Sequence, residues 1–252
     1  MSTIVLMKAF EGAPGRYDLG MRLVTFGAIG RVHEGIAGSI EPGASVLDVG
    51  CGTGGLLPLV AGKHATVRAI DRSAEMVQRA RARAVREGIQ GGVTVHQNTA
   101  MEIDRLFRDA EFDAVVLSLV LSELTEDEQV WVLRQCARVL KPGGTLLVAD
   151  EFRPRSLLKR LAFSGLRLPL HLTAYLYTQV KSLEATGFGW KLYYTVVELP
   201  LMLISFAVGE PLTRPLGDVG EMLPGGLRVA ETRGYAYCPI RLLKIRREDG
   251  SG

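Results

Sequence analysis

A glycine-rich stretch between a strand and a helix is the part of the sequence best suited to hold a ligand. Residues 46–49 are apolar apart from Asp48, and residues 50–54 have the order Gly-Cys-Gly-Thr-Gly. Glycines let the chain turn sharply and let a ligand approach the backbone, because no Cβ stands in the way. The amides that open the next helix are free donors, and the helix dipole favours a negative group there. A plain strand-to-helix turn has the same spacing, so the spacing alone leaves both interpretations open.

A second acid, Asp71, closes the next β-rich run, seventeen positions after Gly54. An acid at this place can accept hydrogen bonds from both hydroxyls of a ribose. It can also belong to the start of the following helix, which opens with Ser73, and both roles are compatible. A nicotinamide-binding turn prefers G-x-G-x-x-G, whereas this one is G-x-G-x-G preceded by Asp48, which argues against a dinucleotide.

Few residues could act as a general base. The candidate catalytic residues are His33 in an N-terminal helical segment, Glu123 after the fourth predicted strand and His171 in an apolar region. Each has a structural alternative, because lone histidines are usually satisfied structural residues and Glu123 could cap or solvate the next helix. Cys51 occupies a position that needs a small residue, and we expect no nucleophilic role for it.

The elements that must position these residues form an alternating pattern. Five β-rich runs alternate with helical patterns, the clearest helices being 73–88 and 126–140; the runs are 44–50, 65–71, 92–97, 112–119 and 144–150. Strands alternating with helices predict βαβ units in a parallel sheet that has helices on both faces. The continuous apolar character of these strands fits burial on both sides.

Two helices carry more specific predictions. In 126–140 the residues Val130, Leu133, Ala137 and Leu140 recur at helical spacing, and the sequence KPGG from position 141 ends the helix. Pro58 is expected to interrupt the helix after the glycine loop and to shorten or bend it.

The predicted fold class is α/β, with a doubly wound, seven-stranded, mostly parallel sheet. Residues 1–43 are expected to form an N-terminal helical lid and 44–151 the ligand-binding core. Residues 152–218 are predicted to be an apolar helical insertion or cap, placed before the last two strands. Residues 219–252 supply those closing strands, at 227–237 and 240–246, and a frayed tail.

Composition narrows the class of protein. The chain has 252 residues, 47% of them hydrophobic, and 30 Lys and Arg against 27 Asp and Glu, a net charge of +3. Such a balance argues against a dedicated nucleic-acid binder. The three cysteines are far apart, without C-x-x-C or H-x-x-x-H pairs, so neither a metal site nor a disulfide framework is indicated. We expect a reduced, cytoplasmic compartment, and the N-terminus lacks the pattern of a secretory signal.

The apolar insertion could serve a substrate, a membrane or a partner. Residues 153–171 contain five basic residues and no acid, interleaved with leucines, a pattern compatible with a membrane surface. Residues 192–208 are apolar but include Glu198 and Pro200, too short and interrupted for a span. Three interpretations stay open: a cap over the substrate pocket, a lipid-facing hairpin across 153–208 that collects a hydrophobic substrate, or a docking surface for a partner protein or for a second copy in a homodimer.

Four motifs in this order resemble the class I S-adenosylmethionine-dependent methyltransferases. They are VLDVGCGTG, AIDRSAEMV, FDAVVLSLVLSEL and RVLKPGGTLLVADE, and they cover about residues 40–151. The resemblance implies a Rossmann-like fold, S-adenosyl-L-methionine as cofactor, and methyl transfer by direct displacement. The sulfonium methyl is already an activated electrophile, so positioning and exclusion of water are the main requirements and no metal is needed.

The resemblance also implies roles for single residues. The loop of Gly50, Cys51, Gly52 and Gly54 would line the methionine part of the cofactor, and Asp48 would hold its amino group. Asp71 would bind the ribose and Arg72 would flank the adenine. The segment Asn98, Thr99, Ala100 and Met101 matches the one that contacts the adenine ring. The family often has an acid where this chain has Asn98, and an amide oxygen could still accept from the adenine amino group. Ser118 and Leu119 would border the transferable methyl.

The flanking sequences narrow the resemblance. Three flanking stretches are similar to corrinoid-protein-associated methyltransferases: FEGAPGRYDLGMRL, SLVLSELTEDEQ and ADEFRPRSLLKRL. The Tyr-Asp pair and KPGG also resemble ubiquinone/menaquinone-biosynthesis methyltransferases, whose N-terminal tyrosine contacts the cofactor carboxylate, a role that maps onto Tyr17. Tyr17 could instead be an interfacial aromatic on a lid helix. Extra apolar sequence around 185–215 departs from the corrinoid-associated pattern.

The implied acceptor is therefore a small hydrophobic molecule or a corrinoid-type group, and a corrinoid protein is the implied partner. One alternative is a membrane-surface methyltransferase, peripheral to the membrane, that acts on a quinone or lipid. Another is a non-catalytic cofactor-binding partner of a corrinoid protein. No nucleic-acid partner is expected.

Overall fold

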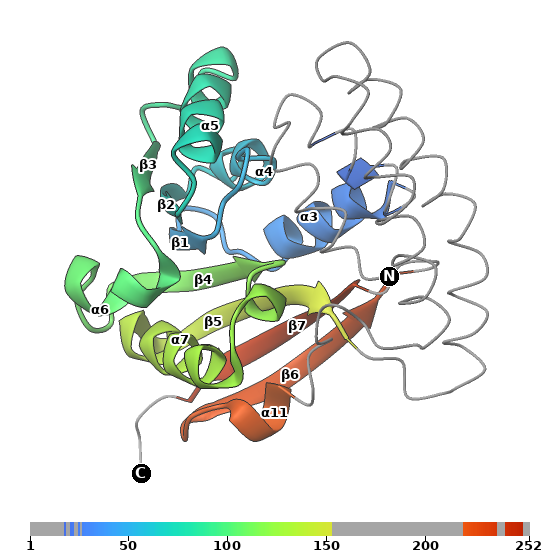
Figure 1. Cartoon of the computed structure of the whole chain (residues 1–252), viewed down its shortest axis with the longest axis vertical. Coiled ribbons are helices and arrows are strands. Elements are labelled where there is room, and N and C mark those ends of the chain that lie inside the picture. The colour runs from blue at the N-terminus through green and yellow to red at the C-terminus, as the bar shows by residue number, and fades with distance from the viewer. Residues whose placement is uncertain are drawn as a thin grey trace, which may run out of the picture.

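A single mixed sheet organises the part of the chain that the computed structural model describes, which is residues 18, 21, 22, 25, 27–152, 219–235 and 240–248. The strand order is β3-β2-β1-β4-β5-β7-β6 (Figure 1). The strands are β1 Ser45–Val49, β2 Thr66–Asp71, β3 Val93–Gln97, β4 Phe112–Ser118, β5 Leu140–Glu151, β6 Leu227–Gly234 and β7 Ile240–Arg247. β1 to β5 are parallel, whereas β7 runs antiparallel to both β5 and β6. The predicted seven-stranded, mostly parallel sheet is confirmed.

Helices cover both faces of this sheet. The described helices are α3 Ala28–Gly38, α4 Leu57–Ala61, α5 Ala74–Arg86, α6 Ile103–Leu106, α7 Glu126–Val139 and α11 Val219–Met222, with 3₁₀ turns η2 Ala100–Glu102 and η3 Leu121–Glu123. α3, α4 and α5 pack on the face that includes Val116, whereas α6, α7 and α11 pack on the face that includes Val115. Because neighbouring strand residues point to opposite faces, β4 contributes to both cores. The doubly wound arrangement is confirmed.

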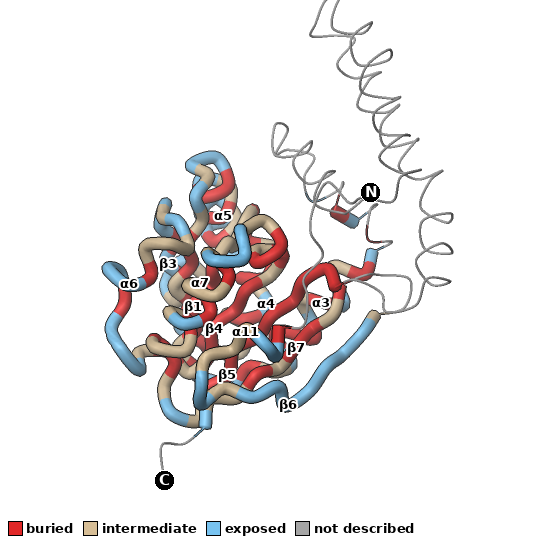
Figure 2. The backbone as a smooth tube through the Cα atoms, turned by 60° about the horizontal axis from the view of Figure 1, so that its bottom comes forward, coloured by how far each residue is buried: buried red, intermediate tan, exposed pale blue. Residues whose placement is uncertain are grey.

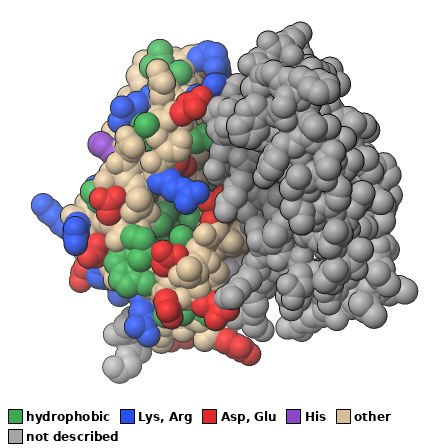
Figure 3. All heavy atoms as spheres, viewed as in Figure 1, with side chains coloured by type: hydrophobic (Ala, Val, Ile, Leu, Met, Phe, Trp, Pro, Cys, Tyr) green, Lys and Arg blue, Asp and Glu red, His purple; other side chains and the backbone are tan. Residues whose placement is uncertain are grey.

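Burial follows the position of each strand in the sheet. The central strands β1, β4 and β5 are almost wholly buried, whereas β6 at the edge is exposed along most of its length (Figure 2). Acidic and basic side chains are interspersed over the described surface in the view of Figure 3. None of the described helices is long and apolar enough to cross a membrane.

Two helices bear on the sequence-based expectations. The helix predicted at 126–140 is confirmed as α7, which buries Val132, Leu133, Cys136 and Val139, whereas Val130 and Ala137 are half-buried. Pro58 does not interrupt α4. It lies in the first turn, where its missing N–H has no intrahelical acceptor to lose, and α4 is five residues long.

The strand boundaries also shift. α7 ends at Val139, and the chain enters β5 at once, with Leu140 paired to Phe112 before a register irregularity in β4. β5 therefore begins four residues before the predicted start at Gly144. β6 ends at Gly234, and residues 236–239 lie outside the described residues.

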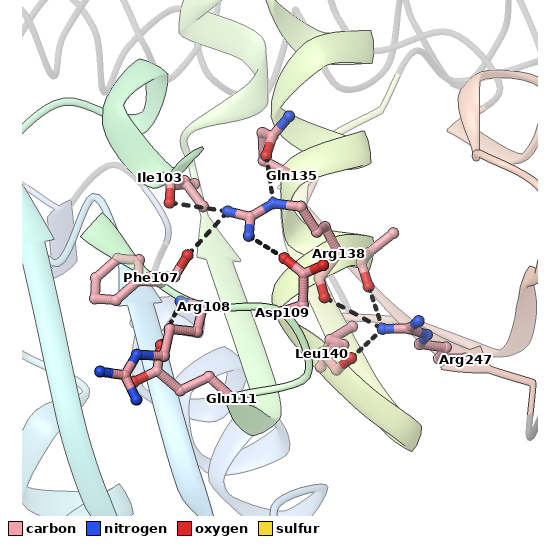
Figure 4. Close-up of polar contacts among 10 residues, drawn as sticks. Ile103, Phe107, Arg108, Asp109, Glu111, Gln135, Arg138, Leu140 and Arg247 are labelled. Atoms are coloured by element: carbon pink, nitrogen blue, oxygen red, sulfur yellow. Dashed lines mark hydrogen bonds and ion pairs between the residues drawn. The ribbon is translucent and has the colours of Figure 1, made fainter. Parts of the chain in front are cut away.

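Two arginines tie the C-terminal ends of α6 and α7 to the rest of the domain (Figure 4). The Arg138 guanidinium donates to the carbonyls of Ile103 and Phe107, at 3.2 and 3.1 Å. Arg247, from β7, donates to the carbonyl of Ala137 at 2.8 Å and also to Leu140. The last carbonyls of a helix lack intrahelical donors, and the two guanidinium groups supply donors at these helix ends; the Ile103 carbonyl also accepts from the Phe107 amide, at 3.2 Å.

The predicted division into a lid, core, insertion and closing strands remains a prediction. Of the N-terminal segment 1–43 the structure describes chiefly α3, and the insertion 153–218 lies outside the described residues. Tyr17 and His171 also lie outside them.

Candidate functional site

The glycine loop turns at the carboxyl ends of β1 and β2. The amides of Gly50 and Cys51 both donate to the carbonyl of Ile70, at 2.8 and 3.0 Å. Gly50, Gly52 and Gly54 have φ values of 72°, 54° and 75°, a region that favours glycine. The loop is therefore anchored to β2 while it passes to α4.

The three glycines are required for different reasons. A Cβ on Gly50 would lie 2.4 Å from Val120 Cγ2, and one on Gly54 would lie 3.1 Å from the backbone of Ala80. A Cβ on Gly52 would meet nothing within 4 Å. Close packing thus explains Gly50 and Gly54, whereas Gly52 leaves open space that a ligand can enter.

Two cavities meet at this loop, at the carboxyl edge of the parallel strands. The first has a volume of about 310 Å³ and the second about 510 Å³. Both are lined by Gly50, Gly52, Ser118 and Leu119. They lie where β1 has β2 on one side and β4 on the other, the switch point at which open α/β sheets bind ligands.

Asp71 lines the first cavity and is held rigidly. Its Oδ2 accepts from the Gly52 amide at 2.8 Å, and its Oδ1 accepts from the Ser73 amide at 2.9 Å. Ser73 caps α5 by accepting from the amide of Met76. Each carboxylate oxygen can accept more than one hydrogen bond, so Asp71 can fix the loop and still receive a ligand's hydroxyls.

The segment after β3 forms another wall of the first cavity, with Asn98, Thr99, Ala100 and Met101 all lining it. Thr99 and Glu102 form a capping box, in which the Thr99 amide donates to Glu102 at 2.8 Å. The Asn98 amide donates to the Asp71 carbonyl at 3.1 Å. The structure therefore brings the predicted adenine segment next to the predicted ribose acid.

An ion pair crosses between two loops that border the first cavity. Arg72, after β2, and Glu123, in η3, are 3.0 Å apart, and both line this cavity. Glu123 does not line the second cavity. Glu123 thus lies beside Arg72 at the first cavity and away from the second.

Asp48 lines the second cavity and has an unsatisfied oxygen. It is 2% exposed, and its Oδ2 has no hydrogen-bond partner. Burial, and then the charge of Asp71, raise the pKa of Asp48 to about 7. A buried acceptor without a partner is costly, so a donor or cation entering this cavity would stabilise it. The chemistry of Asp48 therefore fits a ligand's amino group.

His33, on α3, also lines the second cavity. Burial, and then the positive charge of Arg83, lower the pKa of His33 to about 4. The imidazole is consequently neutral at physiological pH and a weak base.

Several residues that line the cavities were given no role by the sequence, although most of them stand within the quoted motifs. Asp18 accepts from the Thr53 hydroxyl at 2.6 Å and pairs with Arg83, and all three line the second cavity. Met76, Val120, Leu124 and Glu128 line the first cavity. Of these residues only Arg83 lies outside the quoted motifs, so the motifs marked their positions but not their contacts with the cavities.

The two cysteines among the described residues are expected to be unreactive in the native protein. Burial, and then the negative charges of Asp48 and Asp71, raise the pKa of Cys51 well above its ordinary value. Burial raises the pKa of Cys136 to about 12. Because the thiolate is the reactive form, peptide mapping after iodoacetamide treatment at pH 8 should find both thiols unmodified, and modified after denaturation. Rapid native alkylation of Cys51 would contradict this environment.

Part of the chain is similar in sequence to known methyltransferases. Residues 46–144 match the family model described as "Methyltransferase domain". The chain is 31% identical over 156 residues to the ubiquinone/menaquinone biosynthesis C-methyltransferase UbiE of Yersinia enterocolitica, covering 60% of each chain. UbiE of Yersinia pestis matches to the same extent. The chain thus spans about 60% of the length of these curated relatives.

Solved structures share the fold at lower identity. The mitomycin 7-O-methyltransferase MmcR superposes with a TM-score of 0.59 at 19% identity, covering 98% of this chain and 61% of that one. The O-methyltransferase NcsB1 of neocarzinostatin biosynthesis, solved with S-adenosylmethionine and a naphthoic acid, gives a TM-score of 0.55 at 19% identity. Its match covers 94% of this chain and 59% of NcsB1.

Proposed function

We propose that the chain is a class I S-adenosylmethionine-dependent methyltransferase, and that it methylates a small hydrophobic acceptor by direct displacement; the match of residues 46–144 to the methyltransferase domain family and the similarity to UbiE support this. The observation that carries the proposal is the pair of cavities that meet at Gly50 and Gly52. A fixed acid, Asp71, lines one cavity, and an acid with an unsatisfied oxygen, Asp48, lines the other.

The nucleoside half of the donor would occupy the first cavity. Asp71 would accept from the ribose hydroxyls, and the segment Asn98 to Met101 would contact the adenine. Arg72 and Glu123 would enclose the ring through their ion pair. All of these residues follow strand ends that the sheet brings to one edge.

The methionine half would occupy the second cavity, where Asp48 would accept from its amino group. When bound, S-adenosylmethionine supplies a methyl group already activated by the sulfonium. The chain must then orient the acceptor and exclude water. Ser118 and Leu119 line both cavities and would border the reacting centre.

Of the three candidate bases, we retain His33 as the residue that would contact the acceptor, because it lines the second cavity. Its pKa of about 4 makes it a hydrogen-bonding group rather than a strong base at pH 7. Such a weakly basic imidazole would be sufficient for an acceptor whose nucleophilic group is acidic or already reactive. Glu123 would contribute to nucleoside binding, and a catalytic role for His171 remains a prediction.

The acceptor class is inferred from the relatives and from the apolar segment 153–208. The relative UbiE is named for ubiquinone and menaquinone biosynthesis, which favours a hydrophobic ring as acceptor. A corrinoid group, a corrinoid-protein partner and a membrane-borne quinone or lipid are alternatives that the same experiment separates.

The test is incubation of the purified chain with methyl-labelled S-adenosylmethionine and, separately, a demethylated quinone precursor, a reduced corrinoid and a dispersed lipid. Transfer of the label to the quinone precursor would support the proposal. Transfer only to the corrinoid would show that the acceptor is a corrinoid and would contradict the proposed hydrophobic acceptor. Tight donor binding without turnover on any acceptor would favour the non-catalytic alternative. Liposome flotation at low and high salt tests the membrane-surface alternative, which loses its support if neither condition retains the protein.

A Gly52→Ala substitution should weaken binding of S-adenosylhomocysteine, the demethylated donor, by about tenfold or more, because its Cβ would project into the space where the cavities meet. Gly88→Ala is the matched control. Gly88 also has a positive φ, 69°, and open surroundings, but it lines neither cavity. Both variants should lose similar thermal stability, and equal losses of affinity in the two would contradict the assignment of the loop.

A further inference from the structure

The loop between β4 and α7 forms one wall of the first cavity. Leu119, Val120, Glu123 and Leu124 all line that cavity. The loop includes a leucine in a conformation that side chains rarely adopt, since Leu119 has a φ of 59°. A residue in this region persists only when its surroundings hold it there. The loop must therefore be fixed from outside the cavity.

Asp150, near the end of β5, accepts hydrogen bonds from Ser122 in the middle of this loop. Its Oδ1 accepts from the Ser122 hydroxyl at 2.5 Å and from the Glu151 amide at 2.8 Å. Its Oδ2 accepts from the Ser122 amide at 3.2 Å. Asp150 is fully buried and does not line the cavity. The hydroxyl and the backbone amide of Ser122 thus both donate to the same buried carboxyl group.

Neighbouring contacts hold the rest of the loop. The Leu119 amide donates to the carbonyl of Ala149, the residue before Asp150, at 2.8 Å. From α7, the buried amide of Gln129 donates to the carbonyls of Leu121 and Leu124, at 2.9 and 3.1 Å. A network of buried, satisfied hydrogen bonds specifies one geometry more strictly than apolar packing does.

We propose that Asp150 is a positioning residue for the nucleoside cavity, acting through Ser122 to hold the β4–α7 loop in the shape that binds the donor. The inference rests on the proposed function, because it assigns the first cavity to the nucleoside. The contact between Ser122 and Asp150 should therefore set nucleoside affinity in addition to stability.

The chain contains a matched control for this contact. At the opposite edge of the sheet, the Ser45 hydroxyl and amide both donate to Asp113, at 2.6 and 2.8 Å. Neither Ser45 nor Asp113 lines the first or second cavity. Ser122→Ala and Ser45→Ala therefore remove the same kind of hydrogen bond, but only one of them acts on the proposed binding wall.

The experiment measures binding of S-adenosylhomocysteine by calorimetry and the thermal midpoint for wild type and both variants. Ser122→Ala should raise the Kd about threefold to tenfold, whereas Ser45→Ala should leave it unchanged, although it too removes a hydrogen bond between a serine and an aspartate. In turnover assays, Ser122→Ala should raise the KM for the donor more than it lowers kcat. Asp150→Asn, which turns one acceptor oxygen into a donor, should raise the Kd further.

Wild-type affinity in Ser122→Ala, or an equal loss in Ser45→Ala, would overturn the positioning role and leave the proposed function intact. Failure of the wild type to bind would instead overturn the proposed function. If Ser122→Ala did not fold, Asp150→Asn compared with Asp113→Asn would decide the matter in the same way.

Discussion

Replacing Asp71 by alanine should weaken binding of S-adenosylmethionine and S-adenosylhomocysteine at least about a hundredfold. The carboxylate would lose its hydrogen bonds to the ribose, and bonds to a charged group contribute about 1.5–3 kcal/mol each. The substitution would also remove the acceptor for the Gly52 amide, which lies between the two cavities. Isothermal titration calorimetry on the purified variant measures the loss directly.

Asp113→Ala serves as the control for this substitution. Asp113 also accepts a backbone amide and a hydroxyl, both from Ser45, and it pairs with Lys141 at 2.8 Å. This variant should be less stable but bind the donor normally. If Asp71→Ala bound the donor as tightly as wild type, the assignment of the first cavity to a nucleoside would be wrong.

Donor binding should also be coupled to a proton on Asp48. The pKa of this carboxyl is raised from 3.8 to about 7 by burial and by Asp71, so between these pH values the folded protein holds a proton that the unfolded chain has lost. Asp48 alone therefore makes the free protein less stable as the pH rises from about 4 to 7. An ammonium group at the unsatisfied oxygen favours the carboxylate form, so binding should release this proton.

We therefore expect affinity for S-adenosylhomocysteine to be about tenfold higher at pH 8 than at pH 6, and to level off above pH 8. Calorimetry in buffers of different ionisation enthalpy should detect release of close to one proton at pH 6. Asp48→Asn should bind more weakly, with a flat pH profile. A profile that survived in Asp48→Asn would point to Asp150, the other buried carboxyl whose pKa is raised to about 7.

The parts of the site that sequence reasoning found are those whose signal is local. The glycine loop, Asp48 and Asp71 are each recognisable from a strand and the few residues after it. The structure brings them to one edge because β1 and β2 are parallel neighbours, with Asp48 paired to Ala69 in register. Parallel strands end at the same edge, so a correct prediction of parallel strands also brings the residues that follow them to one edge.

Packing decided where the local pattern left options open. Several spacings in 126–140 satisfy helical periodicity, and in contact with β5 and α6 the helix buries Val132 and Cys136 but only half-buries Val130 and Ala137. Pro58 was compatible with an interrupted helix or with a first turn, and the anchored glycine loop placed it in the first turn.

The sequence by itself determined the alternation of strands and helices, the mostly parallel sheet, the glycine loop and the two acids, because alternating apolar runs and turn residues act over a few positions. Only the tertiary structure decided which polar side chains meet. Glu123 forms an ion pair with Arg72, the Asp18 carboxylate accepts a hydrogen bond from the Thr53 hydroxyl, and the Asp150 carboxylate accepts one from the Ser122 hydroxyl. The members of these pairs are 51, 35 and 28 positions apart in the chain. Their meeting depends on how the sheet folds and on which buried polar groups need partners, and no local pattern encodes either.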